Sequence, residues 1–184
     1  FVEDHLNVNG ILEVLPYEGF SVVSTALPSD KNEFTYTYTH YDHLVDCPIE
    51  IGNQEVFDFE AAGVKHTVAI YGDGNYSIPD LKRDMAKIIE EETKVFGQNP
   101  NEDYLFIIHN VVNGQGGLEH KNSTTLSVNR WTYGGSNYLK FLNLVAHEYF
   151  HLWNVKRIRP IELGPFDYNQ ENYTDLLWVM EGFT

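Results

Sequence analysis

Apolar positions in the last quarter of the chain repeat with the period of an α-helix. They recur at spacings of three and four residues, at Leu139, Leu142, Val145, Ala146, Tyr149, Phe150 and Trp153. Ser136 is a plausible N-cap, and no glycine or proline follows until Pro160. The pattern therefore predicts an amphipathic helix in which residues 147–151 lie well inside.

A second helix is expected at residues 78–96, since its apolar positions also share one face. Asp80 or Ser77 can cap its start. The apolar side is formed by Leu81, Met85, Ile88, Ile89 and Val95.

Four segments have the patterns of β-strands. Residues 104–108 form a continuous apolar run, which is typical of a buried strand, and residues 123–128 favour a second strand. The glycine-rich segment 113–117 is expected to be a turn between them. Residues 20–24 and 35–40 alternate in polarity as further strands do.

Two histidines and a glutamate lie in the predicted C-terminal helix at a spacing that suits a metal ion. His147 and His151 are four residues apart, so they share a helix face and can bind one ion. Glu148 projects beside them, within reach of a metal-bound water rather than of the metal. This is the chemistry of a metallopeptidase, in which zinc lowers the pKa of the water and the glutamate takes its proton. The alternative is that both histidines only pack or form hydrogen bonds.

Catalytic zinc needs a third protein ligand and a fourth position open to water. A third histidine in the longer H-E-x-x-H-x-x-G-x-x-H pattern is excluded, because Asn154 and Arg157 occupy those positions. The remaining candidates are glutamates that follow in the sequence, and two of them, Glu162 and Glu171, fall in segments that read as loops.

Glu181 is the third candidate, and we expect it to be the ligand. Thr174 can cap a short helix before it, and Asp175 suits the first turn. The apolar run 176–180 would bury this helix and oblige Glu181 to find a partner. The alternative is a surface glutamate at a helix end.

Several motifs together resemble a known family. Residues 147–160 read H-E-Y-F-H-L-W-N-V-K-R-I-R-P, and residues 176–184 read L-L-W-V-M-E-G-F-T. With G-G-L-E-H at 116–120 and D-C-P-I-E-I-G at 46–52, they resemble the glycyl aminopeptidase family of zinc metallopeptidases. The resemblance extends from about residue 42 to the last residue. It implies a thermolysin-like fold, zinc bound by His147, His151 and Glu181, and Glu148 as general base and acid.

Residues 116–120 are also similar to the G-x-M-E-N segment of the wider alanyl-aminopeptidase class, whose glutamate holds the free α-ammonium group of the substrate. By this resemblance Glu119 is the anchor of an exopeptidase, while His120 replaces an asparagine and leaves the contact with the substrate backbone open. From the residues alone, Gly116 and Gly117 let a substrate backbone approach closely, and an edge strand can pair with an extended peptide. The alternative is a flexible connector with a solvated glutamate.

The net charge limits the classes of binding partner, and the cysteine count limits the possible disulfides. A formal net charge of -15 over 184 residues disfavours binding to nucleic acid and to anionic membranes. No stretch is long enough to span a membrane. The single cysteine, Cys47, excludes an internal disulfide and is expected to be a small buried residue.

The basic residues at 156–159 are expected to stay solvated and complement the helix dipole, although they can also face a substrate carboxylate.

The expected fold class is α+β, in two parts. Residues 1–40 are expected to be the C-terminal part of an N-terminal β domain. Residues 41–184 are expected to be the N-terminal half of a thermolysin-like catalytic domain, its upper subdomain, with a mixed sheet and the active-site helix. Because such a unit continues into a helical lower half, we expect an internal fragment, truncated after Glu181, whose partner is the rest of the parent chain.

The function indicated is that of a zinc-dependent aminopeptidase acting on peptides with a free N-terminus. The resemblance favours small N-terminal residues such as glycine. One alternative is a fragment or peptide-binding module that holds zinc without catalysis, and the other is an endopeptidase that does not need Glu119. The 184 residues alone are expected to show little or no activity, because the group that stabilises the oxyanion is expected beyond Thr184.

Overall fold

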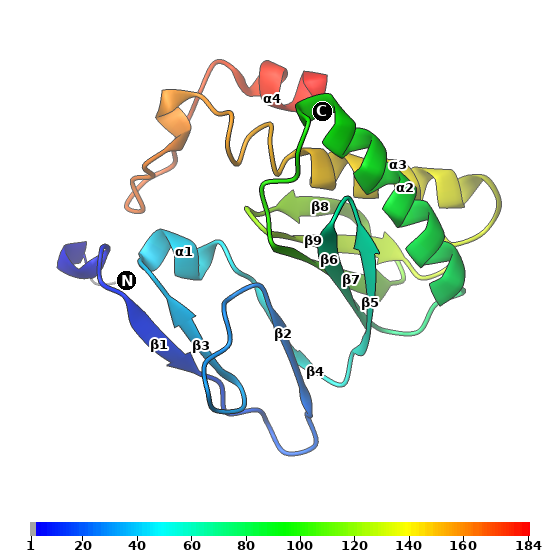
Figure 1. Ribbon diagram of the computed structural model, residues 1–184, viewed down its shortest axis with the longest axis horizontal. Helices are drawn as coiled ribbons and strands as arrows, with labels where there is room; N and C mark the ends of the chain where they lie inside the picture. The colour runs from blue at the N-terminus through cyan, green and yellow to red at the C-terminus, as the bar shows by residue number, and fades with distance from the viewer. Residues whose placement is uncertain (1–2) are drawn as a thin grey trace.

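The computed structural model describes residues 3–184 and is built around a five-stranded mixed sheet (Figure 1). The strand order is β5-β6-β7-β9-β8, with parallel pairs in the middle and an antiparallel strand at each edge. The expectation of an α+β fold with a mixed sheet is confirmed. The strands are β5 (Glu55–Ala61), β6 (Val64–Tyr71), β7 (Asp103–Val111), β8 (Gln115–Glu119) and β9 (Ser123–Asn129).

Two helices, α2 (Ile78–Phe96) and α3 (Gly135–Phe150), cover one face of this sheet and enclose the main core. The expected strands at 104–108 and 123–128 are confirmed as parts of β7 and β9. β7 is apolar on both faces because it is a central parallel strand with structure packed on either side.

The other face is partly covered by the N-terminal segment, which Figure 1 shows on the side of the sheet away from α2 and α3. Ala26 packs there against Ala69, Leu105 and Ile107. This segment forms two small antiparallel sheets, β1 with β3 and β2 with β4, so the strands expected near 20–24 and 35–40 are confirmed. The domain boundary at residue 40 stays a prediction. The elements are η1 (Glu3–His5), β1 (Gly10–Glu13), β2 (Val22–Thr25), β3 (Thr35–Tyr38), α1 (Tyr41–Val45) and β4 (Ile49–Gly52).

Helix α2 has the bounds expected from its pattern. Ser77 occupies the N-cap position, and Gly97, with φ of +83°, ends the helix in the left-handed conformation that glycine tolerates. Val95 was wrongly placed on the apolar side and is 69% exposed, because it lies six residues after the buried Ile89, about 120° around the helix. Among the described residues, no helix is long and apolar enough to cross a membrane.

Helix α3 differs from its expected form at both ends. It begins at Gly135 with Gly134 as N-cap, so the expected cap Ser136 lies in the first turn, and Leu139 is exposed. It ends at Phe150, which makes His151 the C-cap rather than an interior residue. His151 keeps helical dihedrals (φ −62°, ψ −18°), so the four-residue spacing still places it on the same face as His147.

The glycine-rich segment is mostly strand, which corrects the expected turn at 113–117. Residues from Gln115 onward form β8, which pairs antiparallel with β9 and leaves its other side as the sheet edge. Glycine has low strand propensity, but pairing with β9 satisfies the backbone groups and overrides it.

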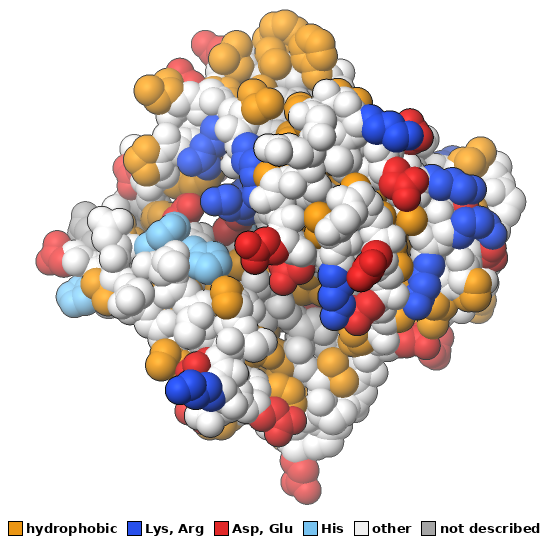
Figure 2. Space-filling view, in the orientation of Figure 1, with side chains coloured by type: hydrophobic (Ala, Val, Ile, Leu, Met, Phe, Trp, Pro, Cys, Tyr) orange, Lys and Arg blue, Asp and Glu red, His pale blue; other side chains and the backbone are white. Residues whose placement is uncertain are grey.

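The C-terminal helix α4 (Leu177–Phe183) follows the short turn η2 (Ile161–Leu163) and is largely exposed. Its N-cap is Leu176, so Thr174 does not cap it and Asp175 is outside its first turn. Met180 is buried, whereas the side chain of Trp178 is 67% exposed, and hydrophobic side chains gather over this end of the molecule (Figure 2). The expected burial of residues 176–180 is therefore wrong, and it is not what brings Glu181 to its partners.

Candidate active site

Three side chains from α3 and α4 converge at one point. The Nε2 atoms of His147 and His151 lie 3.1 Å apart. Oε2 of Glu181 lies 3.1 Å from Nε2 of His147 and 3.5 Å from Nε2 of His151. His151 is 1% exposed, while His147 and Glu181 are 36% and 48% exposed, so the group opens to solvent on one side.

This donor set fits a divalent metal ion. Nδ1 of His151 lies 2.8 Å from the carbonyl oxygen of Asn154, which only accepts, so Nδ1 carries the proton and Nε2 presents a lone pair. Oε2 of Glu181 lies within 3.5 Å of both Nε2 atoms, so a cation among the three would take one nitrogen from each histidine and one carboxylate oxygen. Zinc bonds of about 2.0–2.2 Å in tetrahedral geometry separate ligand atoms by about 3.3–3.5 Å, close to the three distances here.

Glu148 is buried directly beside this group. It is 4% exposed, and its Oε2 has no hydrogen-bond partner among the described residues. Burial, together with the negative charges of Glu119 and Glu181, raises the pKa of Glu148 to about 7. A carboxyl group with this pKa both accepts and releases a proton near neutral pH.

Strand β8 lies so close to Glu148 that a side chain at position 117 would displace the glutamate. A Cβ atom on Gly117 would lie 2.4 Å from Cδ and 2.5 Å from Oε1 of Glu148. Gly116 has φ of +138°, which L side chains rarely adopt. The carboxyl group of Glu148 is thus confined between its own helix and the strand.

Glu119, at the end of β8, also reaches the site. A carboxylate oxygen of Glu119, one of Glu148 and a ring nitrogen of His151 lie within 4.8 Å of one another. His120 is 8% exposed, and its Nδ1 lies 3.3 Å from Oδ1 of Asp46. Its contact with a substrate stays a prediction.

A buried polar network around the Tyr149 side chain fixes the rotation of α3 about its axis. The hydroxyl of Tyr149 accepts from Nδ2 of Asn99 at 2.6 Å and lies 2.9 Å from Nε2 of His66. Nδ1 of His66 lies 2.9 Å from the carbonyl oxygen of Val64 and therefore donates, so the Tyr149 hydroxyl donates to Nε2. Burial lowers the pKa of His66 to about 4, which keeps the ring neutral at pH 7. Because Tyr149 follows Glu148 directly, this network orients the site.

Other sequence candidates lie outside this group. Glu162 accepts from Thr174, and Glu171 accepts from Tyr173, so neither joins the histidines. Cys47 is buried as expected, and burial raises the pKa of its thiol to about 12, which excludes it as a nucleophile near neutral pH.

Two of the basic residues after α3, Lys156 and Arg157, are not solvated as expected, whereas Arg159 is exposed. Nζ of Lys156 pairs with Oδ1 of Asp46 at 2.7 Å, with side chains only 15% and 19% exposed. Oδ2 of Asp46 also accepts from the backbone amide of Lys121 at 2.9 Å. Nη1 of Arg157 donates to the carbonyl oxygens of Lys121 at 3.1 Å and Leu152 at 2.8 Å. Both cations were misjudged because their partners come from segments far away in the sequence.

Asn154 is a structural link that sequence reasoning missed. Its carbonyl oxygen orients His151, and its side-chain Nδ2 donates to the carbonyl oxygen of Met180 at 3.2 Å, next to Glu181. One residue therefore connects two of the candidate ligands. Its position in the W-N-x-K-R-I-R-P motif marks Asn154 as a residue of interest. The spacing of the motif does not show that Asn154 connects His151 with the helix that carries Glu181.

Comparisons with known proteins relate the chain to aminopeptidases. The model of the M61 glycyl aminopeptidase family matches residues 140–184, and that of the peptidase M61 N-terminal domain matches residues 2–53. Among solved structures, the chain is similar to an aminopeptidase N family protein from Idiomarina loihiensis, with a TM-score of 0.91 and 33% sequence identity. The similarity covers 98% of this chain and 33% of that one, so the chain spans about a third of that protein's length. No curated protein matches the chain.

The family matched and the similar solved structure are both described as those of aminopeptidases. Residues 140–184 match the M61 glycyl aminopeptidase family and residues 2–53 match its N-terminal domain, which confirms the resemblance carried by the motifs.

Proposed function

We propose that the chain forms part of a zinc-dependent aminopeptidase that hydrolyses the N-terminal peptide bond of peptides. The observation that carries this proposal is the convergence of His147, His151 and Glu181, with the buried carboxyl group of Glu148 beside them. Zinc at this position would act as a Lewis acid on the scissile carbonyl and make an attacking water more acidic.

Glu148 performs the proton transfers in this proposal. Its carboxylate takes a proton from the attacking water and passes it to the amine that leaves. Gly117 and α3 hold the carboxyl group in place. A reacting group that is already oriented lowers the activation free energy of the reaction.

Glu119 makes the proposed enzyme an exopeptidase. Its carboxylate would accept charge-assisted hydrogen bonds from the substrate's free ammonium group, a few ångströms from Glu148. The open edge of β8 would pair with the extended peptide. Because Gly116 and Gly117 have no side chains, the backbone of the peptide could come close to the strand. His120 is proposed to border the first residue, and a small one such as glycine suits the family resemblance.

We further propose that residues 41–184 form the upper, N-terminal half of a thermolysin-like catalytic domain and that residues 1–40 are the C-terminal part of an N-terminal β domain. The exposed apolar side of α4 supports this, because an uncovered surface of this kind usually meets another element. About half of the Glu181 side chain is exposed to solvent. This exposure supports the expectation that the 184 residues alone show little catalysis. The net charge of -15 disfavours nucleic acid and membranes as partners.

Metal content and hydrolysis in the full-length protein test this proposal. Elemental mass spectrometry should find about one zinc per chain and none in His147→Ala. Glu148→Gln should keep the zinc and lose hydrolysis of a glycine-terminated reporter peptide. Hydrolysis that survives Glu148→Gln would contradict the mechanism, whereas equal cleavage of N-acetylated peptides would show an endopeptidase and remove Glu119 from its role.

A further inference from the structure

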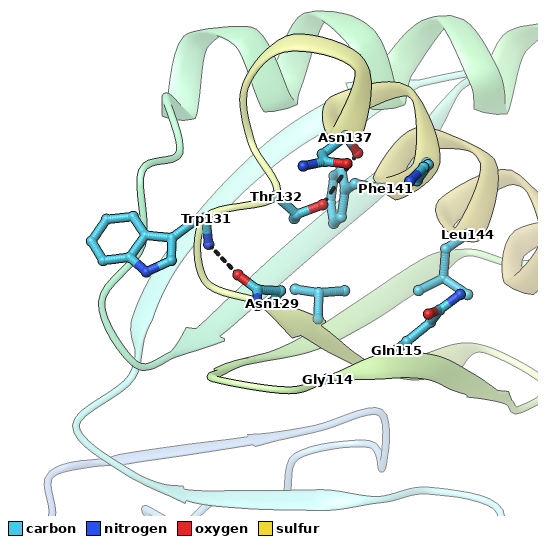
Figure 3. Close-up of a pocket in the computed structure, with 10 residues that line it drawn as sticks. Gly114, Gln115, Asn129, Trp131, Thr132, Asn137, Phe141 and Leu144 are labelled. Atoms are coloured by element: carbon cyan, nitrogen blue, oxygen red, sulfur yellow. Dashed lines mark hydrogen bonds between the residues drawn. The ribbon is translucent and has the colours of Figure 1, made fainter.

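A hollow lies about two helical turns from the candidate metal ligands, between α3 and strands β8 and β9 (Figure 3). Its volume is about 470 Å³. Figure 3 shows Phe141 and Leu144 on α3 and Gln115 on β8 at the hollow, with Trp131, from the segment before the helix, at its border and its ring turned away from Phe141. None of these residues takes part in the proposed chemistry.

The hollow and the metal ligands lie along one path. Lys140 and Leu144 line the hollow and precede His147 by seven and three residues, so all three share a face of α3. A rise of 1.5 Å per residue places Lys140 about 10 Å from His147 along the axis. On the opposite side, β8 runs from Glu119 at the site to Gln115 at the hollow, about 13 Å for four residues.

Charge changes sign along this path. The site end carries the carboxylates of Glu119, Glu148 and Glu181. The ten residues that line the hollow include no carboxylate and one cation, Lys140, which is exposed and makes no ion pair among residues 3–184. An unpaired cation bordered by no acid is notable in a chain with 27 acidic and 12 basic residues. The polarity matches a short peptide whose amine lies at Glu119 and whose far end is anionic.

We propose that this hollow binds a carboxylate on the leaving-group side of the peptide, at the fourth residue from its N-terminus. This rests on the proposed function, because Glu119 sets the direction of the peptide. With the first residue beside Glu119, three strand spacings of about 3.4 Å bring the fourth opposite Gly116, next to Gln115 at the edge of the hollow. Lys140 then binds the carboxylate, and Leu144 contacts the apolar part of that residue. The carboxylate comes either from the C-terminus of a tetrapeptide or from an acidic side chain.

Binding rather than turnover tests this proposal. The zinc-loaded full-length protein carrying Glu148→Gln is titrated calorimetrically with Gly-Ala-Ala-Ala as the free acid and as the C-terminal amide. A second pair, Gly-Ala-Ala-Glu-amide and Gly-Ala-Ala-Gln-amide, separates the side-chain source from the terminal one. We expect the anionic member of at least one pair to bind about 1.5- to fivefold more tightly, the range for an exposed ion pair.

Lys140→Gln should reduce that ratio to about one, whereas Lys94→Gln, which removes the same charge from α2 outside the hollow, should leave it unchanged. Lys140 is on the surface, so its replacement should not disturb folding. Equal binding of both members of both pairs, or a preference that survives Lys140→Gln, would overturn the proposal. N-acetylation tests Glu119 separately: unchanged affinity on acetylation would remove the amine anchor and with it the proposed function.

Discussion

Replacement of Gly117 by alanine should separate catalysis from folding in this site. The new Cβ atom would lie 2.4 Å from Cδ of Glu148, whereas ordinary contacts begin at 3.4 Å. The backbone of Gly117 is not in the left-handed region, so alanine itself is not strained there. Because the atoms met belong to the far end of a flexible side chain, Glu148 should move and the strand should stay.

The distances give the size of the effect. The carboxyl group has to move by about 1 Å to restore ordinary contact, and a displacement of this size at a reacting group costs on the order of 100-fold in rate. That corresponds to about 2.7 kcal/mol in the activation free energy. A side chain forced off its preferred rotamer costs about 0.5–1.5 kcal/mol, partly offset by the lower unfolded-state entropy of alanine. The free energy of unfolding should therefore change by less than about 1 kcal/mol.

The assay combines kcat/KM for a glycine-terminated reporter peptide, zinc content and urea unfolding, all in the full-length protein. Gly116→Ala is the matched comparison, since its Cβ meets nothing within 4 Å while its φ of +138° is strained for alanine. That variant should lose about 1–3 kcal/mol of unfolding free energy without a contact that displaces Glu148. If Gly117→Ala keeps kcat/KM within about twofold of the wild type, the confinement of Glu148 by β8 has no catalytic value.

Two further predictions concern stability. Burial raises the pKa of Glu92 from 4.5 to about 8, because the folded protein disfavours the charged carboxylate. The free energy of unfolding is therefore highest below pH 4.5, where the group is protonated in both states, and it falls as the pH rises through 8. Glu92→Gln should thus gain roughly 3 kcal/mol over the wild type between pH 5 and pH 9 in urea unfolding, and parallel pH profiles would contradict this. Asp46→Asn leaves the buried ammonium of Lys156 without its partner and should cost about 2–4 kcal/mol. Asp58→Asn is its control, because the pair with Lys65 is about half exposed and should cost less than about 1 kcal/mol; equal losses in both variants would refute the role of burial.

Local periodicity determined much of this protein from the sequence alone. The bounds of α2 followed from an apolar stripe that needs only neighbours three and four residues away. The placement of His147 and His151 on one helix face, with Glu148 beside them, followed from the same geometry. These features depend on the backbone within a single turn, so the order of residues is enough to specify them.

Tertiary structure decided everything that joins distant segments. Residues 115–117 have the composition of a turn, but the free edge of β9 makes them strand. Glu181 was expected to reach the histidines because its helix would be buried; that helix is exposed, and Asn154 links it to α3 instead. Lys156 was expected in solvent but pairs with Asp46, 110 residues away in the chain. A side chain's burial and partners depend on which surfaces the fold brings together, and no local pattern contains that information.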